Sequence, residues 1–156
     1  ERIAEIVVVA RPCDHEALRE TAAKCGITKL KTITEGGDTR QGSVIKGLKC
    51  ISEDTKLVAI HDGARPFVSE EVITAALQGA AETGCAAPAV PVKDTVKVAK
   101  EGVVVSTPDR AQLYAVQTPQ VVHGGRYRLA LEHLNGKTFQ VDKVDFVEEY
   151  FPGTKI

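Results

Sequence analysis

The sequence predicts an α/β fold: a Rossmann-like, doubly wound and mostly parallel sheet with a protruding β-hairpin arm. Two observations predict the sheet. Short runs rich in β-branched residues alternate with helix-like segments of ten or more residues, and the first run, EIVVVA at 5–10, lacks the polar alternation of a half-exposed strand. A third observation predicts the arm, because the chain alternates with period two on each side of the Lys-Glu-Gly that ends at 102.

The first half of the chain supplies two strand–helix pairs. The run at 5–10 reads as a central parallel strand, and it precedes a helix that Asp14 can cap and Gly26 can end. The second strand, LKTITE at 30–35, leads through a glycine-rich stretch into a helix that begins near Ser43.

Two further strands follow. KLVAIH at 56–61 is the third strand, and Ser69 caps a helix with an acidic first turn that ends at Gly84 in a left-handed conformation. CAAPAVPV at 85–92 is read as the fourth strand. The β-arm spans about 93–117, and the segments 124–136 and 144–151 are predicted to be helical.

Composition narrows the classes of function. The 156 residues carry a formal net charge of −1 and 43% hydrophobic residues, which suits one domain over 1–156 and gives no general attraction for nucleic acid. No apolar run reaches the roughly 20 residues of a membrane span, so no membrane partner is expected. The four cysteines form no CxxC pair, which favours reduced core thiols in a cytoplasmic protein.

The turn after the third strand, HDGARPF at 61–67, has two interpretations. It can be a simple polar turn in which Asp62 caps the backbone or pairs with Arg65. Ligands of doubly wound sheets bind at the carboxyl ends of strands, where an aspartate can face a metal-bound polyphosphate and an arginine can hold a phosphate by two hydrogen bonds. Gly63 would let the backbone approach such a ligand closely.

A second turn, EGGDTRQGS at 35–43, follows the preceding strand. Its two glycines permit unusual backbone angles, Asp38 offers an acceptor, and Ser43 lies near the start of the next helix. The stretch lacks the Walker spacing GxxxxGK[ST], so a ligand loop and a plain strand-to-helix turn stay open. Two such turns on neighbouring strands strengthen the ligand interpretation.

Five motifs in order resemble one known family. ITEGGDTRQGSVIKGL, LVAIHDGARPFVS, VPVKDTVKV, TPDRAQLYAVQTPQVV and GRYRLALEHL are similar to 2-C-methyl-D-erythritol 4-phosphate cytidylyltransferase. The resemblance implies an enzyme of isoprenoid precursor biosynthesis that joins CTP to the sugar phosphate and releases pyrophosphate. It also implies a divalent cation, Mg²⁺, and a homodimer formed through the β-arm.

The resemblance also implies roles for individual residues. Asp62 matches the magnesium-binding catalytic acid, and Arg65 matches a catalytic arginine at the sugar phosphate. The cytosine of CTP would be recognised by Gly37, Asp38 and Ser43, with Gly63 beside the ribose. The sugar phosphate would also be reached by Thr95, Arg110 and Thr118, of which Arg110 and Thr118 would act across the dimer. No general base is needed, because a phosphate monoester with a second pKa of about 6 is already ionised, so His61 is expected to be a structural hydrogen-bonding residue.

The family pattern is not matched everywhere. Its first strand and lysine-bearing nucleotide loop, and its closing strand with a second catalytic lysine, have no counterpart, so we expect an incomplete chain that turns over poorly or not at all. VDKVDF at 141–146 stands where the family carries a further substrate-side threonine. Two alternatives stay open: a ribitol-5-phosphate cytidylyltransferase, and a non-catalytic, dimerising nucleotide-binding module.

Overall fold

The structure, a computed structural model, describes residues 3–125, 127 and 128. The chain divides into two compact units: the first comprises Glu1–Thr55 with Arg128–Val144, and the second comprises Lys56–Tyr127 with Asp145–Ile156. Each unit is described by itself. The single domain over 1–156 stays a prediction.

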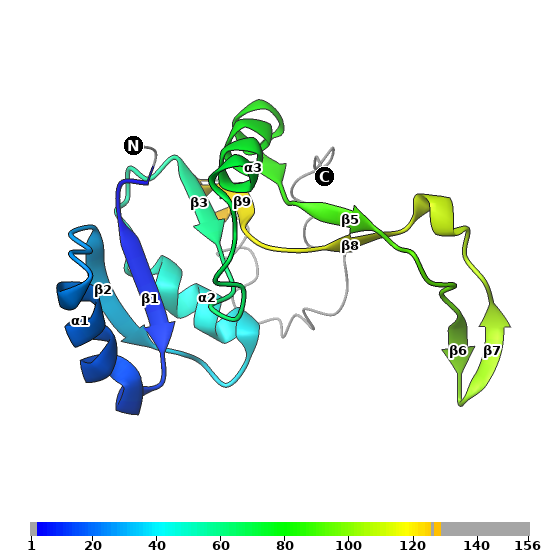
Figure 1. The fold of residues 1–156 in the computed structure, drawn as a ribbon, viewed down its shortest axis with the longest axis horizontal. Helices are drawn as coiled ribbons and strands as arrows, with labels where there is room; N and C mark the ends of the chain where they lie inside the picture. The colour runs from blue at the N-terminus through cyan, green and yellow to red at the C-terminus, as the bar shows by residue number, and fades with distance from the viewer. Residues whose placement is uncertain (1–2, 126, 129–156) are drawn as a thin grey trace. The chain divides into compact units, whose positions relative to one another are not determined.

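The first unit contains a parallel strand pair with two helices (Figure 1). Strand β1, Ile6–Ala10, pairs in parallel with β2, Leu30–Glu35, and Val8 lies opposite Ile33. Between them the chain forms a short 3-10 helix and then α1, His15–Lys24, and after β2 it forms α2, Arg40–Leu48. The predicted strands and helices of this half are therefore confirmed, as is the parallel direction of the pair.

The ends of α1 lie where the sequence predicts them, but the predicted side-chain cap by Asp14 is not formed. Asp14 is the N-cap residue, yet its carboxylate accepts a hydrogen bond from Arg11 Nε at 2.9 Å and makes no cap hydrogen bond. Gly26, just past the helix, has a φ of 65°, where a side chain would be strained. A local ion pair thus replaces the predicted side-chain cap.

Close approach of α2 to β1 organises the packing of the first unit. A Cβ at Gly47 would lie 2.9 Å from Val9 Cγ2, so only glycine allows this helix–strand distance. Among the residues of this unit that the structure describes, the buried apolar side chains come from both helices and from β2; they are Ala22, Ile33 and Leu48.

A polar network around Glu5 joins the start of the first unit to the loop after α2. The Glu5 carboxylate accepts hydrogen bonds from the Ser52 backbone N–H at 2.6 Å and from Ser52 Oγ at 2.8 Å. Lys31 Nζ lies 2.9 Å from the same carboxylate. The backbone N–H of Ser52, followed by the Lys31 ammonium, lowers the pKa of Glu5 from 4.5 to about 2.

This network predicts acid sensitivity. Since the folded pKa of Glu5 lies below its unfolded value, its stabilisation is complete above about pH 4.5 and is lost as pH falls toward 2. Glu5→Gln should lower the free energy of unfolding by about 1–3 kcal/mol at pH 7 and by less at pH 3, as measured by urea denaturation. Glu16→Gln, in an exposed helix pair with Arg19, is the control and should change little at either pH. A Glu5→Gln effect that is the same at both pH values would contradict the prediction.

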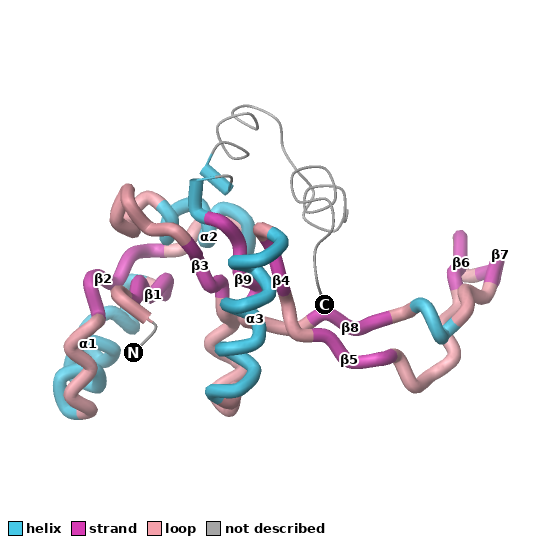
Figure 2. The backbone as a smooth tube through the Cα atoms, turned by 90° about the horizontal axis from the view of Figure 1, so that it is seen from above, coloured by secondary structure: helices cyan, strands magenta, loops and turns pink. Residues whose placement is uncertain are grey.

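The second unit is built on a three-stranded sheet with α3 packed on it (Figure 2). Its strands are β3, Leu57–Ile60, β4, Cys85–Ala86, and β9, Gln120–His123, in the order β3-β9-β4. β9 is antiparallel to both neighbours, so β3 and β4 run in the same direction. The helix α3, Glu70–Thr83, connects them.

Both predicted ends of α3 are confirmed. Ser69 Oγ accepts a hydrogen bond from the Val72 N–H at 3.4 Å, and Gly84 adopts a left-handed conformation with φ 93°. The small side chains of Ala76 and Ala80 let the helix pack on Val121 of β9, which is fully buried. The next residue, Val122, points to the opposite face, where it contacts Cys85.

The fourth predicted strand is wrong as a single element. The structure divides 85–92 into β4 and β5, Ala89–Pro91, which pair with different strands. Pro88 between them has no N–H to donate to a sheet, and the chain changes partner there, from β9 to β8. The central antiparallel strand β9 was not predicted, because its four residues follow a proline and give too short a periodic signal.

The β-arm is confirmed as a hairpin. β5 pairs with β8, Tyr114–Val116, and the chain between them forms the antiparallel pair β6, Val98–Lys100, and β7, Val103–Ser106 (Figures 1 and 2). The tight turn uses Glu101 and Gly102, both with positive φ. A short 3-10 helix, Arg110–Gln112, leads from β7 to β8.

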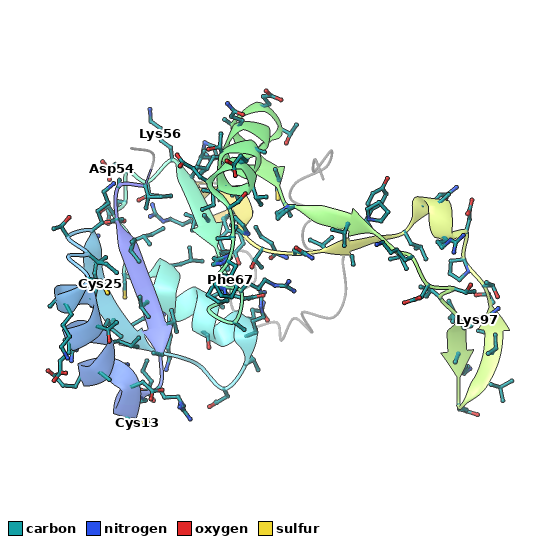
Figure 3. The ribbon with its side chains drawn as sticks, viewed as in Figure 1. Cys13, Cys25, Asp54, Lys56, Phe67 and Lys97 are labelled. Atoms are coloured by element: carbon teal, nitrogen blue, oxygen red, sulfur yellow. The ribbon has the colours of Figure 1, made fainter. Side chains whose placement is uncertain are left out.

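The cysteines differ from the expectation of core thiols. All four lie in the described part of the chain and none forms a disulfide, but only Cys85 is buried. Cys13 and Cys25 are exposed on either side of α1 (Figure 3). Among the described helices, none has the length and apolar character to cross a membrane. The predicted helices at 124–136 and 144–151 lie largely or wholly outside the described residues.

Candidate active site

The predicted site residues fall on two strand-end turns and on the arm. The glycine turn at 36–39, between β2 and α2, lies in the first unit together with Ser43 in the first turn of α2. The turn at 61–66 lies in the second unit, after β3. The juxtaposition of the two turns stays a prediction, and each is described separately.

The glycine turn folds tightly onto the first turn of α2. The Gly37 N–H donates to Ser43 Oγ at 3.0 Å, and that hydroxyl donates to the Thr39 carbonyl oxygen at 3.0 Å. Thr39 is the N-cap of α2 and accepts from the Gly42 N–H at 3.0 Å. Lys46 Nζ donates to the Gly36 carbonyl oxygen at 2.7 Å. The turn is therefore held by side chains from the helix that it precedes.

Gly36 and Gly37 are required because a Cβ would clash with neighbouring atoms, not because of a positive φ. A Cβ on Gly37 would lie 2.8 Å from the backbone carbonyl carbon of Gly42, and a Cβ on Gly36 would lie 2.9 Å from Ser43 Oγ. The exposed Asp38 lies just before Thr39 at the N-terminal end of α2. The structure thus brings Gly37 and Ser43 into contact and places Asp38 beside them. The capping role of Thr39 was not predicted, although a threonine just before a helix favours it.

The turn after β3 brings Asp62 and Arg65 together. The Arg65 N–H donates to the Asp62 carbonyl oxygen at 3.0 Å, which closes the turn. Arg65 Nε lies 3.6 Å from Asp62 Oδ2, and both side chains are more than a third exposed. The pairing expected of a simple polar turn is therefore present, in a loose geometry that leaves both groups accessible to solvent.

Thr118 lies against this turn rather than on the arm. It is 6% exposed, and its Oγ1 accepts from the Asp62 N–H at 3.2 Å and lies 3.1 Å from His61 Nδ1. The structure thus joins the base of the arm to the turn, a contact across more than fifty residues that sequence reasoning missed. Its role at a partner's substrate stays a prediction.

The other predicted residues lie elsewhere in the second unit. Arg110 is exposed, and its Nη1 donates to the Lys93 carbonyl oxygen at 2.9 Å, which ties the two sides of the arm. Thr95 is exposed between β5 and β6. At Gly63 a Cβ would meet nothing within 4 Å, so neither packing nor φ requires glycine there.

The carboxylate of Asp62 suits one kind of metal site. Within the described residues, no group of three or more His, Cys, Asp or Glu side chains could enclose an ion. Mg²⁺ keeps several waters and is commonly bound by one or two carboxylates together with substrate phosphates. A half-exposed aspartate at a strand end fits that mode and does not fit a metal held by protein ligands alone.

Strand-end turns of this kind define a class of protein. An acid–guanidinium turn and a glycine turn at a helix N-terminus, each after a strand of an α/β fold, are typical of proteins that bind phosphorylated ligands at the carboxyl ends of strands. Comparison with known proteins specifies the family. Residues 1–155 match the family model "IspD: 2-C-methyl-D-erythritol 4-phosphate cytidylyltransferase", and the chain therefore belongs to this family.

Individual relatives agree. The chain is 44% identical over 125 residues to 2-C-methyl-D-erythritol 4-phosphate cytidylyltransferase of Alkaliphilus metalliredigens, covering 79% of this chain and 52% of the relative. It is 49% identical over 115 residues to the protein of the same name from Halalkalibacterium halodurans, covering 74% and 50%. The chain thus spans about half the length of the curated relatives it matches.

Solved structures share the fold. The crystal structure of 4-diphosphocytidyl-2C-methyl-D-erythritol synthase from Anaerococcus prevotii matches with a TM-score of 0.85 and 29% identity, covering 98% of this chain and 68% of that one. The 2-C-methyl-D-erythritol 4-phosphate cytidylyltransferase of Thermus thermophilus matches with a TM-score of 0.75 and 28% identity, covering 98% and 71%. The predicted Rossmann-like α/β fold and the predicted family are confirmed.

Proposed function

We propose that the full-length protein is a cytidylyltransferase that forms 4-diphosphocytidyl-2-C-methyl-D-erythritol and pyrophosphate from CTP and 2-C-methyl-D-erythritol 4-phosphate, in isoprenoid precursor biosynthesis. The observation that carries the proposal is the turn after β3, which presents Asp62 and Arg65 side by side at a strand end. The family match over 1–155 supports the identity of the substrates. The thiols of the four cysteines suit a cytoplasmic location.

The chemistry starts from repulsion between two anions. A phosphate oxygen of the sugar phosphate attacks the α-phosphorus of CTP, and pyrophosphate leaves in line. Asp62 would hold the divalent cation, proposed to be Mg²⁺, which supplies neutralisation of the charge on the triphosphate. Asp62 is thereby assigned to the metal and to catalysis.

Arg65 is assigned to the attacking phosphate. Its 3.6 Å pairing with Asp62 is long and solvent-accessible, so the guanidinium can exchange the carboxylate for a phosphate at little energetic cost. A planar guanidinium binds two phosphate oxygens at once and fixes their direction of attack. The Asp62–Arg65 pair is, in this view, the resting arrangement of two groups that separate when the substrates bind.

The glycine turn is assigned to the cytosine ring. Gly37, Asp38 and Ser43 lie at the N-terminal end of α2, and hydrogen bonds through Ser43 Oγ hold the turn against the helix. Gly63 is assigned to the ribose side, where the open space above its Cα permits close approach.

A direct assay tests the proposal. The full-length protein, with CTP and Mg²⁺, should release pyrophosphate when given 2-C-methyl-D-erythritol 4-phosphate and far more slowly when given ribitol 5-phosphate. Preference for ribitol 5-phosphate would replace the proposed substrate. Tight CTP binding without pyrophosphate release would replace the enzyme with a nucleotide-binding module.

We also propose a homodimer formed through the β-arm, in which Thr95 and Arg110 serve the sugar phosphate and Arg110 acts across the dimer. Thr118, whose buried hydroxyl bonds to the turn of its own chain, is proposed to serve the phosphate only through that turn. The support is the apolar surface of the arm: five valines are 37% to 67% exposed, namely Val96, Val98, Val103, Val104 and Val105. Two strands with such a surface are marginally stable alone and gain stability by packing on a partner.

The proposed interface predicts that negative charges on the apolar face of the arm prevent dimer formation. Val103→Asp with Val105→Asp, two residues on one face of β7, should convert the dimer to a monomer in light scattering after size-exclusion chromatography. Lys100→Asp changes the charge of the arm by the same amount without removing apolar surface, and this control should stay dimeric. A dimer that survives the double substitution would place the interface elsewhere.

A further inference from the structure

The ring of His61 joins both ends of the turn that presents Asp62 and Arg65. His61 Nε2 lies 3.0 Å from the Arg65 carbonyl oxygen, at the last residue of the turn. His61 Nδ1 lies 3.1 Å from Thr118 Oγ1. The same hydroxyl oxygen accepts from the Asp62 N–H at 3.2 Å, at the first residue of the turn. One imidazole and one buried hydroxyl therefore span the turn.

The hydrogen-bond inventory assigns the protons in this arrangement. A backbone N–H can only donate and a carbonyl oxygen can only accept, so the Asp62 amide donates to Thr118 Oγ1 and the Arg65 carbonyl accepts from His61 Nε2. The Thr118 hydroxyl proton can then be donated to His61 Nδ1. An imidazole that donates from Nε2 satisfies every group in the series.

The arrangement leaves no ring nitrogen for proton transfer. Nδ1 is engaged by a buried threonine hydroxyl and Nε2 by a backbone carbonyl of the same turn. A general base must place a nitrogen within hydrogen-bond reach of the proton that it removes from the substrate. The geometry of His61 is that of a residue that fixes backbone.

We propose that His61 is a positioning residue of the active site: together with Thr118 it holds the turn at 62–65 in the one conformation that aims the Asp62 carboxylate and the Arg65 guanidinium at the substrates. This inference rests on the proposed function. It extends that function by assigning the alignment of its two charged groups to a hydrogen-bonded series that begins more than fifty residues away in the sequence.

Alignment errors have a kinetic signature. Displacing reacting groups by about 1 Å can cost roughly 100-fold in rate, because the aligned state then forms rarely. Cytosine recognition is assigned to the separate glycine turn, so loss of the His61 contacts should lower kcat and leave the KM for CTP nearly unchanged. Substitution of a residue that served stability alone would lower the melting temperature without this selective loss of kcat.

The variants separate the two contacts of the ring. His61→Asn retains an acceptor near the position of Nδ1 for the Thr118 hydroxyl, and His61→Gln retains a donor near the position of Nε2 for the Arg65 carbonyl. His61→Ala removes both. Thr118→Val removes the hydroxyl with little change of shape, and Thr118→Ser keeps it. The exposed His123, at the end of β9, provides the control His123→Asn.

The test is steady-state pyrophosphate release by the full-length protein, with melting temperatures for each variant. We expect His61→Ala to lower kcat by roughly 10- to 100-fold with a KM for CTP within about threefold of the unaltered protein. His61→Asn and His61→Gln should each recover part of the loss. The double variant His61→Ala with Thr118→Val should be no slower than the slower single variant, because both substitutions break the same series.

Opposite results would overturn the inference. The first is a kcat of His61→Ala within twofold of the unaltered protein. The second is a kcat that neither His61→Asn nor His61→Gln raises above that of His61→Ala. The third is a double variant whose loss of kcat equals the product of the losses in His61→Ala and Thr118→Val. If His61→Ala fails to fold, the kcat values of His61→Asn and His61→Gln relative to the unaltered protein decide the question. Full activity of both variants would reject the proposal. Failure of the unaltered protein to release pyrophosphate would instead reject the proposed function.

Discussion

Asp62→Asn is expected to lower kcat for pyrophosphate release by at least about 100-fold, since a bound metal contributes several kcal/mol to a phosphoryl-transfer transition state and each 1.4 kcal/mol is a factor of ten. Asparagine keeps the size of aspartate and the backbone N–H that donates to Thr118 Oγ1, so the turn should persist. It lacks the negative charge that would hold a divalent cation. The loss should therefore appear in catalysis and not in the melting temperature.

The measurement is steady-state turnover of the full-length protein over a range of Mg²⁺ concentrations. Chelation with EDTA should abolish turnover of the unaltered protein, and added Mg²⁺ should restore it. The Asp62→Asn variant should respond only weakly to added Mg²⁺. The exposed Asp54, in a surface turn of the first unit, gives a control: Asp54→Asn should leave turnover within about twofold. Equal turnover by the Asp62→Asn variant would remove the metal assignment.

Gly37→Ala is expected to give the second largest effect, on the glycine turn. The added Cβ would lie 2.8 Å and 2.9 Å from the backbone C and Cα atoms of Gly42, and backbone in the first turn of a helix cannot move aside as a side chain can. Overpacking of this kind typically costs about 1–3 kcal/mol. Since the Gly37 N–H donates to Ser43 Oγ, the shift also displaces the hydroxyl assigned to cytosine.

Two measurements follow for this variant: the free energy of unfolding by urea, and the Kd for CTP by titration calorimetry. We expect a loss of about 1–3 kcal/mol in the first. If a similar free energy is lost from the complex, the Kd for CTP rises about tenfold or more. Gly63→Ala is the control for stability, because its Cβ meets nothing within 4 Å and its φ lies outside the left-handed region. It should be neutral or stabilising by up to about 1 kcal/mol. A Gly37→Ala variant as stable as Gly63→Ala would show that the turn relaxes freely.

Local features of the fold could be predicted because a few adjacent residues specify them. The run LKTITE forms β2 over the same six residues that its pattern indicates. Gly84 takes the left-handed conformation that ends α3, where any other residue would be strained. Glu101 and Gly102 form the tight turn of the arm. At Gly84 and Gly102 the conformational freedom of glycine decides the conformation, and Glu101 takes its positive φ as the other residue of the tight turn.

Parts of the candidate site could also be predicted. Placement of Asp62 and Arg65 on one turn after β3 follows from their spacing and from the strand that precedes them. The glycine turn between β2 and α2, with Ser43 near the start of the helix, also follows from the local sequence. These are again neighbours along the chain, joined by one turn of backbone.

What the sequence by itself determined was the order of strands and helices, the turn residues and the family motifs, because propensity and patterning act within a few residues of one another. Only the tertiary structure decided that β9 enters between β3 and β4, that Pro88 divides the predicted fourth strand, and that the buried Thr118 hydroxyl bonds to His61 and Asp62. Such contacts join segments more than twenty residues apart. They are fixed by which apolar faces can be buried together and which buried polar groups can satisfy one another, and no local pattern records either.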